Sequence, residues 1–176
     1  MRFHRFAARP NWRYQVQELG FNLALLEDPP YWMEAHDEPF CAEFSKAELK
    51  NVFEPSVRRI MQLALELVDK VTSPSQSDKL CQRLKIAPAF LAAIYKSWQR
   101  KDPTLYGRLD WSYNEGQFKL LELNLDTPTS LFESALLQKL WLGDLQSQTA
   151  LDPAFLQLNV IHEKLLDAFK RIIPEG

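Results

Sequence analysis

The chain has 176 residues, of which 46% are apolar and 25% are charged, and its formal net charge is −2. These values are typical of a soluble globular protein, and a chain of this length can bury a substantial core. The small net charge argues against a dedicated nucleic-acid-binding protein. No apolar run approaches the ~20 residues that a membrane-spanning helix needs. We therefore expect neither nucleic acid nor a membrane as a partner.

The N-terminus is basic, because it carries Arg2, Arg5, Arg9 and Arg13 and no acidic residue before Glu18. It lacks the apolar segment of a secretion signal. A basic arm, a transit peptide and a solvated, partly structured start all fit this composition.

The cysteines and histidines are too scattered for a metal or disulfide framework. Cys41 and Cys81 form no CxxC motif, and the three histidines stand far apart in the sequence, which makes a zinc site improbable. We expect both cysteines to be reduced and mostly buried, in a cytoplasmic protein.

The first third of the chain predicts one short helix, a long loop and a short strand. Residues 11–21 form the helix, with Asn11 as its N-cap and Gly20 at its C-terminal end. Residues 25–40 are rich in proline and acidic residues and predict mostly loop, whereas 39–44 indicate a short strand.

A long amphipathic helix follows over residues 45–71. Ser45 and Glu48 have the spacing of a capping box, and Pro55 should kink or split the helix. An apolar stripe with helical spacing runs along it, formed by Leu49, Val52, Phe53, Val57, Ile60, Met61, Ala64, Leu67, Val68 and Val71.

The next elements are a loop and two shorter helices. Residues 72–78 predict a loop by composition, 78–85 a helix, and 88–100 another helix with Pro88 in its first turn.

The segment 105–126 predicts a β-hairpin. Two alternating runs flank residues 114–116, which we interpret as a three-residue loop ending in Gly116. Helices are then predicted over 128–142 and from Asp152 through Ile173. The fold class is therefore α+β: a mainly helical domain with a small sheet built around this hairpin.

The hairpin should gather polar side chains on one face, because side chains alternate along a strand. A three-residue loop pairs Tyr113 with Gln117 and therefore Arg108 with Glu122, which places Asp110 diagonal to Glu122. The leucines of the second strand then form its buried face. The polar cluster consists of Arg108, Asp110, Glu122 and Asn124.

Such a face suits a cation and an anion together. Neighbouring carboxylates repel each other unless a cation lies between them, and carboxylate and amide oxygens are ligands for Mg²⁺ rather than for zinc. Arg108 offers a fork of donors for a carboxylate or phosphoryl oxygen. The alternative is a solvated face on which Arg108 and Glu122 form a cross-strand ion pair.

A helix N-terminus is predicted directly after the second strand. Either Thr127 caps it with Pro128 in its first turn, or Ser130 and Glu133 form a capping box one turn later. Its free amide groups favour an anionic ligand. Capping alone explains these residue types equally well.

The run from Leu105 to Trp141 resembles the signature of the glutathionylspermidine synthase family, through the block G-R-x-D … E-x-N-x-D-T-P-T-S. More narrowly, it resembles the pre-ATP-grasp part of the bacterial synthase-like proteins. Residues 9–21, 29–40 and 92–98 also match the family, so the resemblance extends over most of the chain.

The resemblance implies an ATP-grasp ligase that uses ATP and Mg²⁺. Family members activate the glycine carboxylate of glutathione as an acyl phosphate and then join it to an amine of spermidine. By matching position, Arg108 contacts the reacting carboxylate or phosphoryl group. The implied metal ligands are Asp110, Glu122 and Asn124.

Three further residues match the segment that contacts the glutathione-like substrate, namely Thr127, Thr129 and Ser130. Bifunctional family members carry smaller residues there, which is a departure in this sequence. The implied partners are a glutathione-like or peptide-like carboxylate, a polyamine or other amine, and a covalently linked or docked ATP-grasp module.

The sequence also departs from the family in lacking a nucleotide-binding segment. Its five glycines are never clustered, and it has no Walker-type loop. We therefore expect a single pre-ATP-grasp-like domain over 1–176, a fragment or short product that is inactive by itself. The alternatives are a non-catalytic ligand-binding or subunit-docking module and a purely structural helical domain.

Overall fold

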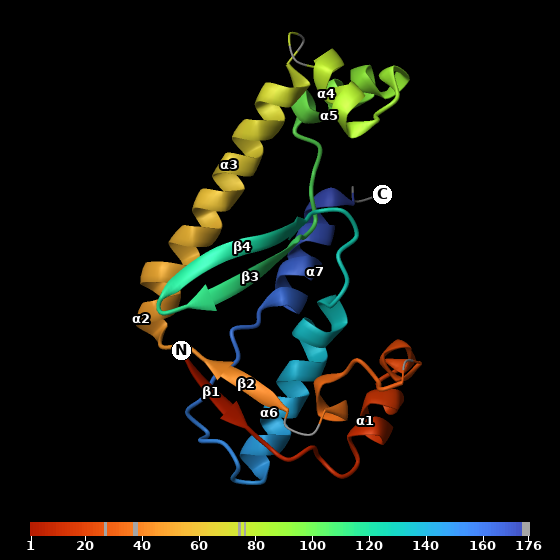
Figure 1. The fold of residues 1–176 in the computed structure, drawn as a ribbon. Helices are drawn as coiled ribbons and strands as arrows, with labels where there is room; N and C mark the ends of the chain where they lie inside the picture. Colours follow the sequence, from red (N-terminus) through yellow and green to blue (C-terminus); the bar gives the residue numbers. More distant parts are fainter. Residues whose placement is uncertain (27, 37–38, 74, 76, 174–176) are drawn as a thin grey trace. The chain divides into compact units, whose positions relative to one another are not determined.

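The computed structural model is mainly helical with two small antiparallel sheets, which confirms the predicted α+β class (Figure 1). The chain divides into two compact units, unit 1 over Met1–Phe53 and unit 2 over Glu54–Gly176, and each is described by itself. The structure describes residues 1–26, 28–36, 39–73, 75 and 77–173. Within these ranges, no helix has both the length and the apolar character needed to cross a membrane.

Unit 1 contains a sheet of two short strands, β1 (Arg2–Arg5) and β2 (Phe40–Glu43). They pair antiparallel, with His4 opposite Cys41. The strand predicted at 39–44 is confirmed, and the basic N-terminus is itself a paired strand.

Helix α1 (Trp12–Glu18) confirms the predicted short helix. Asn11 is its N-cap, as predicted, and its main-chain carbonyl accepts from the Gln15 N–H, whereas its side chain forms no capping hydrogen bond. Gly20 has a φ of +79°, the left-handed conformation in which glycine ends a helix without strain. Among the described residues of the segment 25–40, which exclude 27, 37 and 38, helical structure is confined to short 3₁₀ turns, namely the end of η1 (Asn22–Leu25) and all of η2 (Met33–Ala35), and Phe40 begins β2.

The capping box at Ser45 is confirmed at the start of α2 (Lys46–Glu48). The Ser45 N–H donates to Glu48 Oε2 at 2.8 Å, and the Glu48 N–H donates to Ser45 Oγ at 3.1 Å. The π-helical segment η3 (Leu49–Phe53) follows, just before Pro55. The α-helical hydrogen-bond pattern is thus interrupted next to the proline, which has no N–H to donate.

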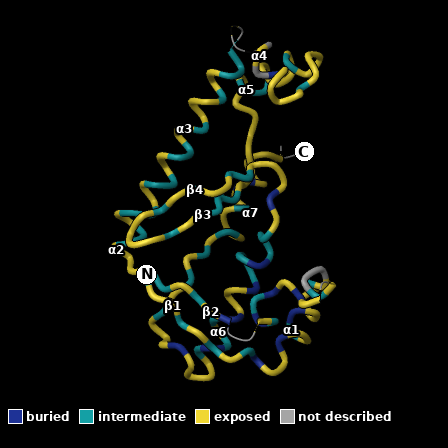
Figure 2. Tube along the Cα trace, viewed as in Figure 1, coloured by how far each residue is buried: buried dark blue, intermediate teal, exposed yellow. Residues whose placement is uncertain are grey.

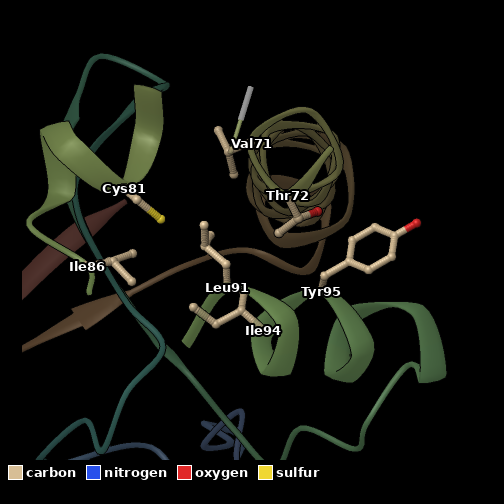
Figure 3. Close-up of a pocket in the computed structure, with 7 residues that line it drawn as sticks. All are labelled: Val71, Thr72, Cys81, Ile86, Leu91, Ile94 and Tyr95. Atoms are coloured by element: carbon tan, nitrogen blue, oxygen red, sulfur yellow. The ribbon is translucent and has the colours of Figure 1, made fainter. Parts of the chain in front are cut away.

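In unit 2, α3 (Glu54–Thr72) is followed by α4 (Ser77–Leu84), η4 (Pro88–Phe90) and α5 (Leu91–Arg100). Helices α4 and α5 both contact α3. The α3 residues of the predicted stripe are half-buried except Leu67, which is exposed. An apolar cavity of about 30 Å³ lies among these helices, lined in part by Cys81, Leu91 and Tyr95 (Figure 3).

The predicted helix over 128–142 begins later than expected and runs further. Leu131 is its first helical residue, followed by the π-helical segment η5 (Glu133–Leu137) and α6 (Gln138–Ser147). The buried apolar residues of this part of unit 2 are Leu137, Trp141, Leu145, Leu151 and Ala168 (Figure 2).

The last helix, α7 (Ile161–Ile172), is shorter than the helix predicted from Asp152, because residues 152–160 are irregular. Asn159 provides the physical reason. Its Nδ2 donates to the carbonyl oxygens of Ser134 at 2.7 Å and Ala135 at 2.8 Å, while its Oδ1 accepts from the Ile161 N–H. These bonds satisfy carbonyls in the π-helical segment and hold the preceding chain out of a helix.

Candidate functional site

The candidate site is built on a hairpin of β3 (Arg108–Asn114) and β4 (Gln117–Asn124). Asn114 pairs with Gln117, so the connection has two residues, and the predicted three-residue loop is wrong. Glu115 and Gly116 have φ values of +47° and +82°. Two consecutive positive φ values are what a type I′ hairpin turn requires, and this turn matches the twist of the strands.

The strand register also differs from the prediction. Asp110 lies directly opposite Glu122, not diagonal to it, and Arg108 lies opposite Asn124, not Glu122. A register shift after Asp110 separates this part of the ladder from the turn. The four polar residues still share one face, because directly opposed residues point to the same side, and that part of the prediction is confirmed.

The irregularity has a signal in the sequence of β4. Its half-buried apolar residues are Phe118 and Leu120 before the shift and Leu123 after it, so the apolar alternation changes phase. One extra residue must be accommodated if all three are to face the same side, and a β-bulge does this. Leu121 is consequently 70% exposed, and Leu125 just after the strand is 51% exposed, so the prediction that the leucines form a buried face is wrong for both.

Arg108 is the centre of the cluster. Its Nε donates to Asp110 Oδ1 at 2.9 Å, and its Nη2 lies 3.8 Å from Glu122 Oε1. Its Nη1 donates to Thr129 Oγ1 at 2.8 Å. One half-buried guanidinium therefore joins the two carboxylates of the hairpin to the loop that follows it.

The loop before the helix is held in an unusual main-chain conformation. Thr127 and Ser130 have φ values of +45° and +73°, which non-glycine residues adopt at some cost, while Pro128 between them is buried. The helix starts at Leu131, so Thr127 is not its N-cap, and the Ser130 carbonyl accepts from the Ser134 N–H. Of the three predicted substrate-contacting residues, Thr129 is the one that Arg108 contacts.

Two residues that the sequence analysis did not single out position this loop. The Tyr106 hydroxyl donates to the Pro128 carbonyl at 3.2 Å. Gly107 packs so closely against the Leu125 side chain that a Cβ at this position would collide with it. The sequence signal that could have indicated them is the G-R-x-D block, which Gly107 opens and Tyr106 directly precedes.

The oxygen donors of this face could supply only some of the ligands that Mg²⁺ requires. Asp110 and Glu122 supply two carboxylates, and Asn124 supplies an amide. Among the described residues, no group of three or more His, Cys, Asp or Glu side chains could hold a metal ion. A partial set suits Mg²⁺, which keeps several waters and commonly shares its coordination with phosphate oxygens. Arg108 would have to release the carboxylates for such an ion to bind.

Comparison with known proteins places the chain among ligase-related sequences. The family model for the glutathionylspermidine synthase pre-ATP-grasp domain matches residues 3–176. A Haemophilus influenzae protein named "Putative acid–amine ligase" is 30% identical over 169 residues. That match covers 94% of this chain and 39% of the relative, so the chain spans about two fifths of the relative's length.

Proposed function

The chain belongs to the glutathionylspermidine synthase pre-ATP-grasp family, and we propose that it supplies the metal- and carboxylate-binding half of an ATP-dependent acid–amine ligase site. The contact of Arg108 with Asp110, Glu122 and Thr129 carries this proposal. It places a cation, two carboxylates and a hydroxyl on one partly exposed face, where a charged substrate can exchange partners with them.

The proposed reaction has two steps. A substrate carboxylate attacks the γ-phosphorus of ATP, which forms an acyl phosphate and releases ADP. A polyamine or another amine then attacks the acyl carbon, forms the amide bond and releases phosphate. Arg108 would hold the carboxylate and offset the charge on the transferring group, and the Thr129 hydroxyl would orient the same oxygens. Mg²⁺ held by Asp110, Glu122 and Asn124 would neutralise phosphoryl charge.

The compartment follows from the same proposal. ATP is available in the cytoplasm, and Cys41 and Cys81 are both free thiols in the structure, as is usual for proteins of a reducing compartment. We therefore place the proposed ligase in the cytoplasm.

A second candidate is a non-catalytic module that binds a carboxylate ligand or docks onto another subunit. The hairpin face favours it in one respect, because Arg108, Asp110 and Thr129 are joined within this chain and can hold a carboxylate without a nucleotide. Such a module would use Arg108 for binding but would need no nucleotide.

The deciding experiment is ATP hydrolysis by a polypeptide that carries this chain together with the nucleotide-binding module. Arg108→Ala or Glu122→Ala should lower carboxylate-dependent hydrolysis by about 10²-fold or more, with little change in Tm. Arg100→Ala is the matched control, because Arg100 forms an exposed pair with Asp102 at the same two-residue spacing. Wild-type turnover by either hairpin variant would refute the role proposed for the hairpin face.

A further inference from the structure

The loop after β4 is tied to the beginning of β3 by hydrogen bonds from two side chains. Arg108 Nη1 donates to Thr129 Oγ1 at 2.8 Å, and the Tyr106 hydroxyl donates to the Pro128 carbonyl at 3.2 Å. Tyr106 comes two residues before Arg108 in the sequence. Both donors therefore come from one short stretch of chain, and their acceptors are on neighbouring residues of the loop.

The Tyr106 bond controls the orientation of Thr129, although its acceptor belongs to Pro128. The oxygen that accepts from Tyr106 is part of the peptide group that joins Pro128 to Thr129, and a peptide group is planar. Fixing this oxygen therefore fixes the direction in which the main chain enters Thr129. Thr129 is exposed, so packing against other residues does little to hold it.

This support matters because the main chain is strained on both sides of the same peptide group. Thr127 and Ser130 have φ values of +45° and +73°. Residues other than glycine keep such values only where surrounding contacts hold them there. Without the Tyr106 bond, the loop should relax toward ordinary φ values, which would move the Thr129 hydroxyl away from Arg108.

The two bonds to the loop respond differently to a carboxylate ligand. In the proposed function, Arg108 and the Thr129 hydroxyl both turn to the oxygens of the substrate, so the direct bond between them is given up. A hydroxyl can make this change because it donates as well as accepts. The Tyr106 bond involves neither group and can persist in the complex.

We infer that Tyr106 is a positioning residue for the carboxylate substrate, and that it acts through the Pro128 carbonyl on the Thr129 hydroxyl. It keeps Thr129 beside Arg108 while Arg108 exchanges its partners in the protein for the substrate. This role rests on the proposed function, because it concerns the substrate of the same site.

The test is the kinetics of glutathione-dependent ATP hydrolysis by a polypeptide that carries this chain together with the nucleotide-binding module. Tyr106→Phe should raise the KM for glutathione by about 3- to 10-fold, the loss expected for one hydrogen bond between uncharged groups. The kcat should stay nearly unchanged, because the contact holds the carboxylate in the ground state and the transition state alike. The KM for ATP should not change.

Tyr95→Phe is the matched control, because it removes the same hydroxyl group from a tyrosine on α5. Tyr95 is 40% exposed and Tyr106 is 37% exposed. The Tyr95 hydroxyl forms no hydrogen bond to another described residue. Tyr95→Phe should therefore leave the KM for glutathione at the wild-type value.

Thr129→Val shows whether Tyr106 acts through Thr129. Valine keeps the branched shape of threonine and removes the hydroxyl. In the Thr129→Val background, Tyr106→Phe should have no further effect on the KM for glutathione, since the group that Tyr106 positions is gone. Two effects that multiply in full would show that Tyr106 does not act through Thr129.

Arg108→Ala separates the role of Tyr106 from the role of the hairpin face. If Arg108→Ala loses hydrolysis while Tyr106→Phe keeps the wild-type KM for glutathione, Tyr106 does not position the substrate and the role of the face stands. Wild-type turnover by Arg108→Ala would refute both roles. A lower Tm in Tyr106→Phe with an unchanged KM would assign Tyr106 to the stability of the loop alone.

Discussion

Two arginine–carboxylate clusters in this protein use the same chemistry in opposite settings. In unit 1, Arg9 binds Glu34 through Nε at 2.8 Å and Nη2 at 2.6 Å, and the Glu34 side chain is 0% exposed. In unit 2, Arg108 contacts Asp110 and Glu122, whose side chains are 40% and 57% exposed. One cluster is closed to solvent and the other is open to it.

The two clusters differ in how many hydrogen-bond donors each carboxylate has. Glu34 also accepts from the Arg9 main-chain N–H at 3.1 Å and from Trp32 Nε1 at 2.9 Å, so four donors fix it inside the unit. Glu122 is held by Arg108 at 3.8 Å and is more than half exposed. Burial makes the first cluster a part of the fold, whereas the second is exposed, as the proposed exchange of partners with a ligand requires.

Removing Glu34 should have the largest effect on stability. Glu34→Ala leaves the Arg9 guanidinium buried without its counter-charge, which should cost about 3–5 kcal/mol of the free energy of unfolding of unit 1. Hydrogen exchange of the α1 amides measures this cost. Glu122→Ala is the control, and an equal loss in both variants would contradict the contrast between the clusters.

Asn159→Ala tests a part-buried contact between uncharged groups. The carbonyls of Ser134 and Ala135 lose their side-chain donor, which should destabilise η5 and α6 by about 1–3 kcal/mol. Faster amide exchange across residues 133–147 would show it. Gln157→Ala should do less, because its bond to the Ser134 carbonyl is long at 3.5 Å. Unchanged exchange in Asn159→Ala would show that the irregular segment is held by other contacts.

Removing the exposed Arg108 cluster of unit 2 should hardly change the stability of the fold. Arg108→Ala should change the free energy of unfolding by about 1 kcal/mol or less, because ion pairs in solvent contribute little. Urea denaturation followed by far-UV circular dichroism measures this change. A loss as large as that expected for Glu34→Ala would mean that Arg108 holds the fold together and is not kept for a ligand.

The smallest effect is expected at the exposed capping box of α2. The Met1 ammonium group, together with the Ser45 N–H and hydroxyl, lowers the pKa of Glu48 from 4.5 to about 2. A depressed carboxyl pKa stabilises the folded state above pH 4.5, and this contribution is lost as the pH falls toward 2. Glu48→Gln should therefore reduce the pH dependence of Tm between these values. An unchanged pH profile would contradict this role for Glu48.

Local patterns predicted the local structure well. The apolar stripe of α3, the capping box at Ser45 and the alternation that indicated the hairpin each depend on residues a few positions apart. Each is confirmed, except that Leu67 of the stripe is exposed. The shared polar face of the hairpin was also correct, because the bulge kept Arg108 and Glu122 on the same side.

The errors came from contacts between residues far apart in the sequence and from one-residue differences in the turn and the second strand of the hairpin. Asn159 keeps residues 152–160 out of a helix through bonds to carbonyls 24 and 25 residues earlier, which no periodicity reveals. Arg9 and Glu34 are likewise 25 residues apart. At the hairpin, a two-residue turn and a bulge each shifted the register by one, so the predicted pairs were wrong although the face was right.

The face of Arg108, Asp110, Glu122 and Asn124 is proposed to bind a cation together with a carboxylate ligand. The most direct measurement is paramagnetic broadening of amide NMR signals on titrating Mn²⁺, a substitute for Mg²⁺, into the chain with glutathione present. We predict selective broadening of residues 108–110 and 122–124, which Glu122→Gln removes. Broadening spread evenly over the acidic surface, and unchanged by Glu122→Gln, would contradict the account.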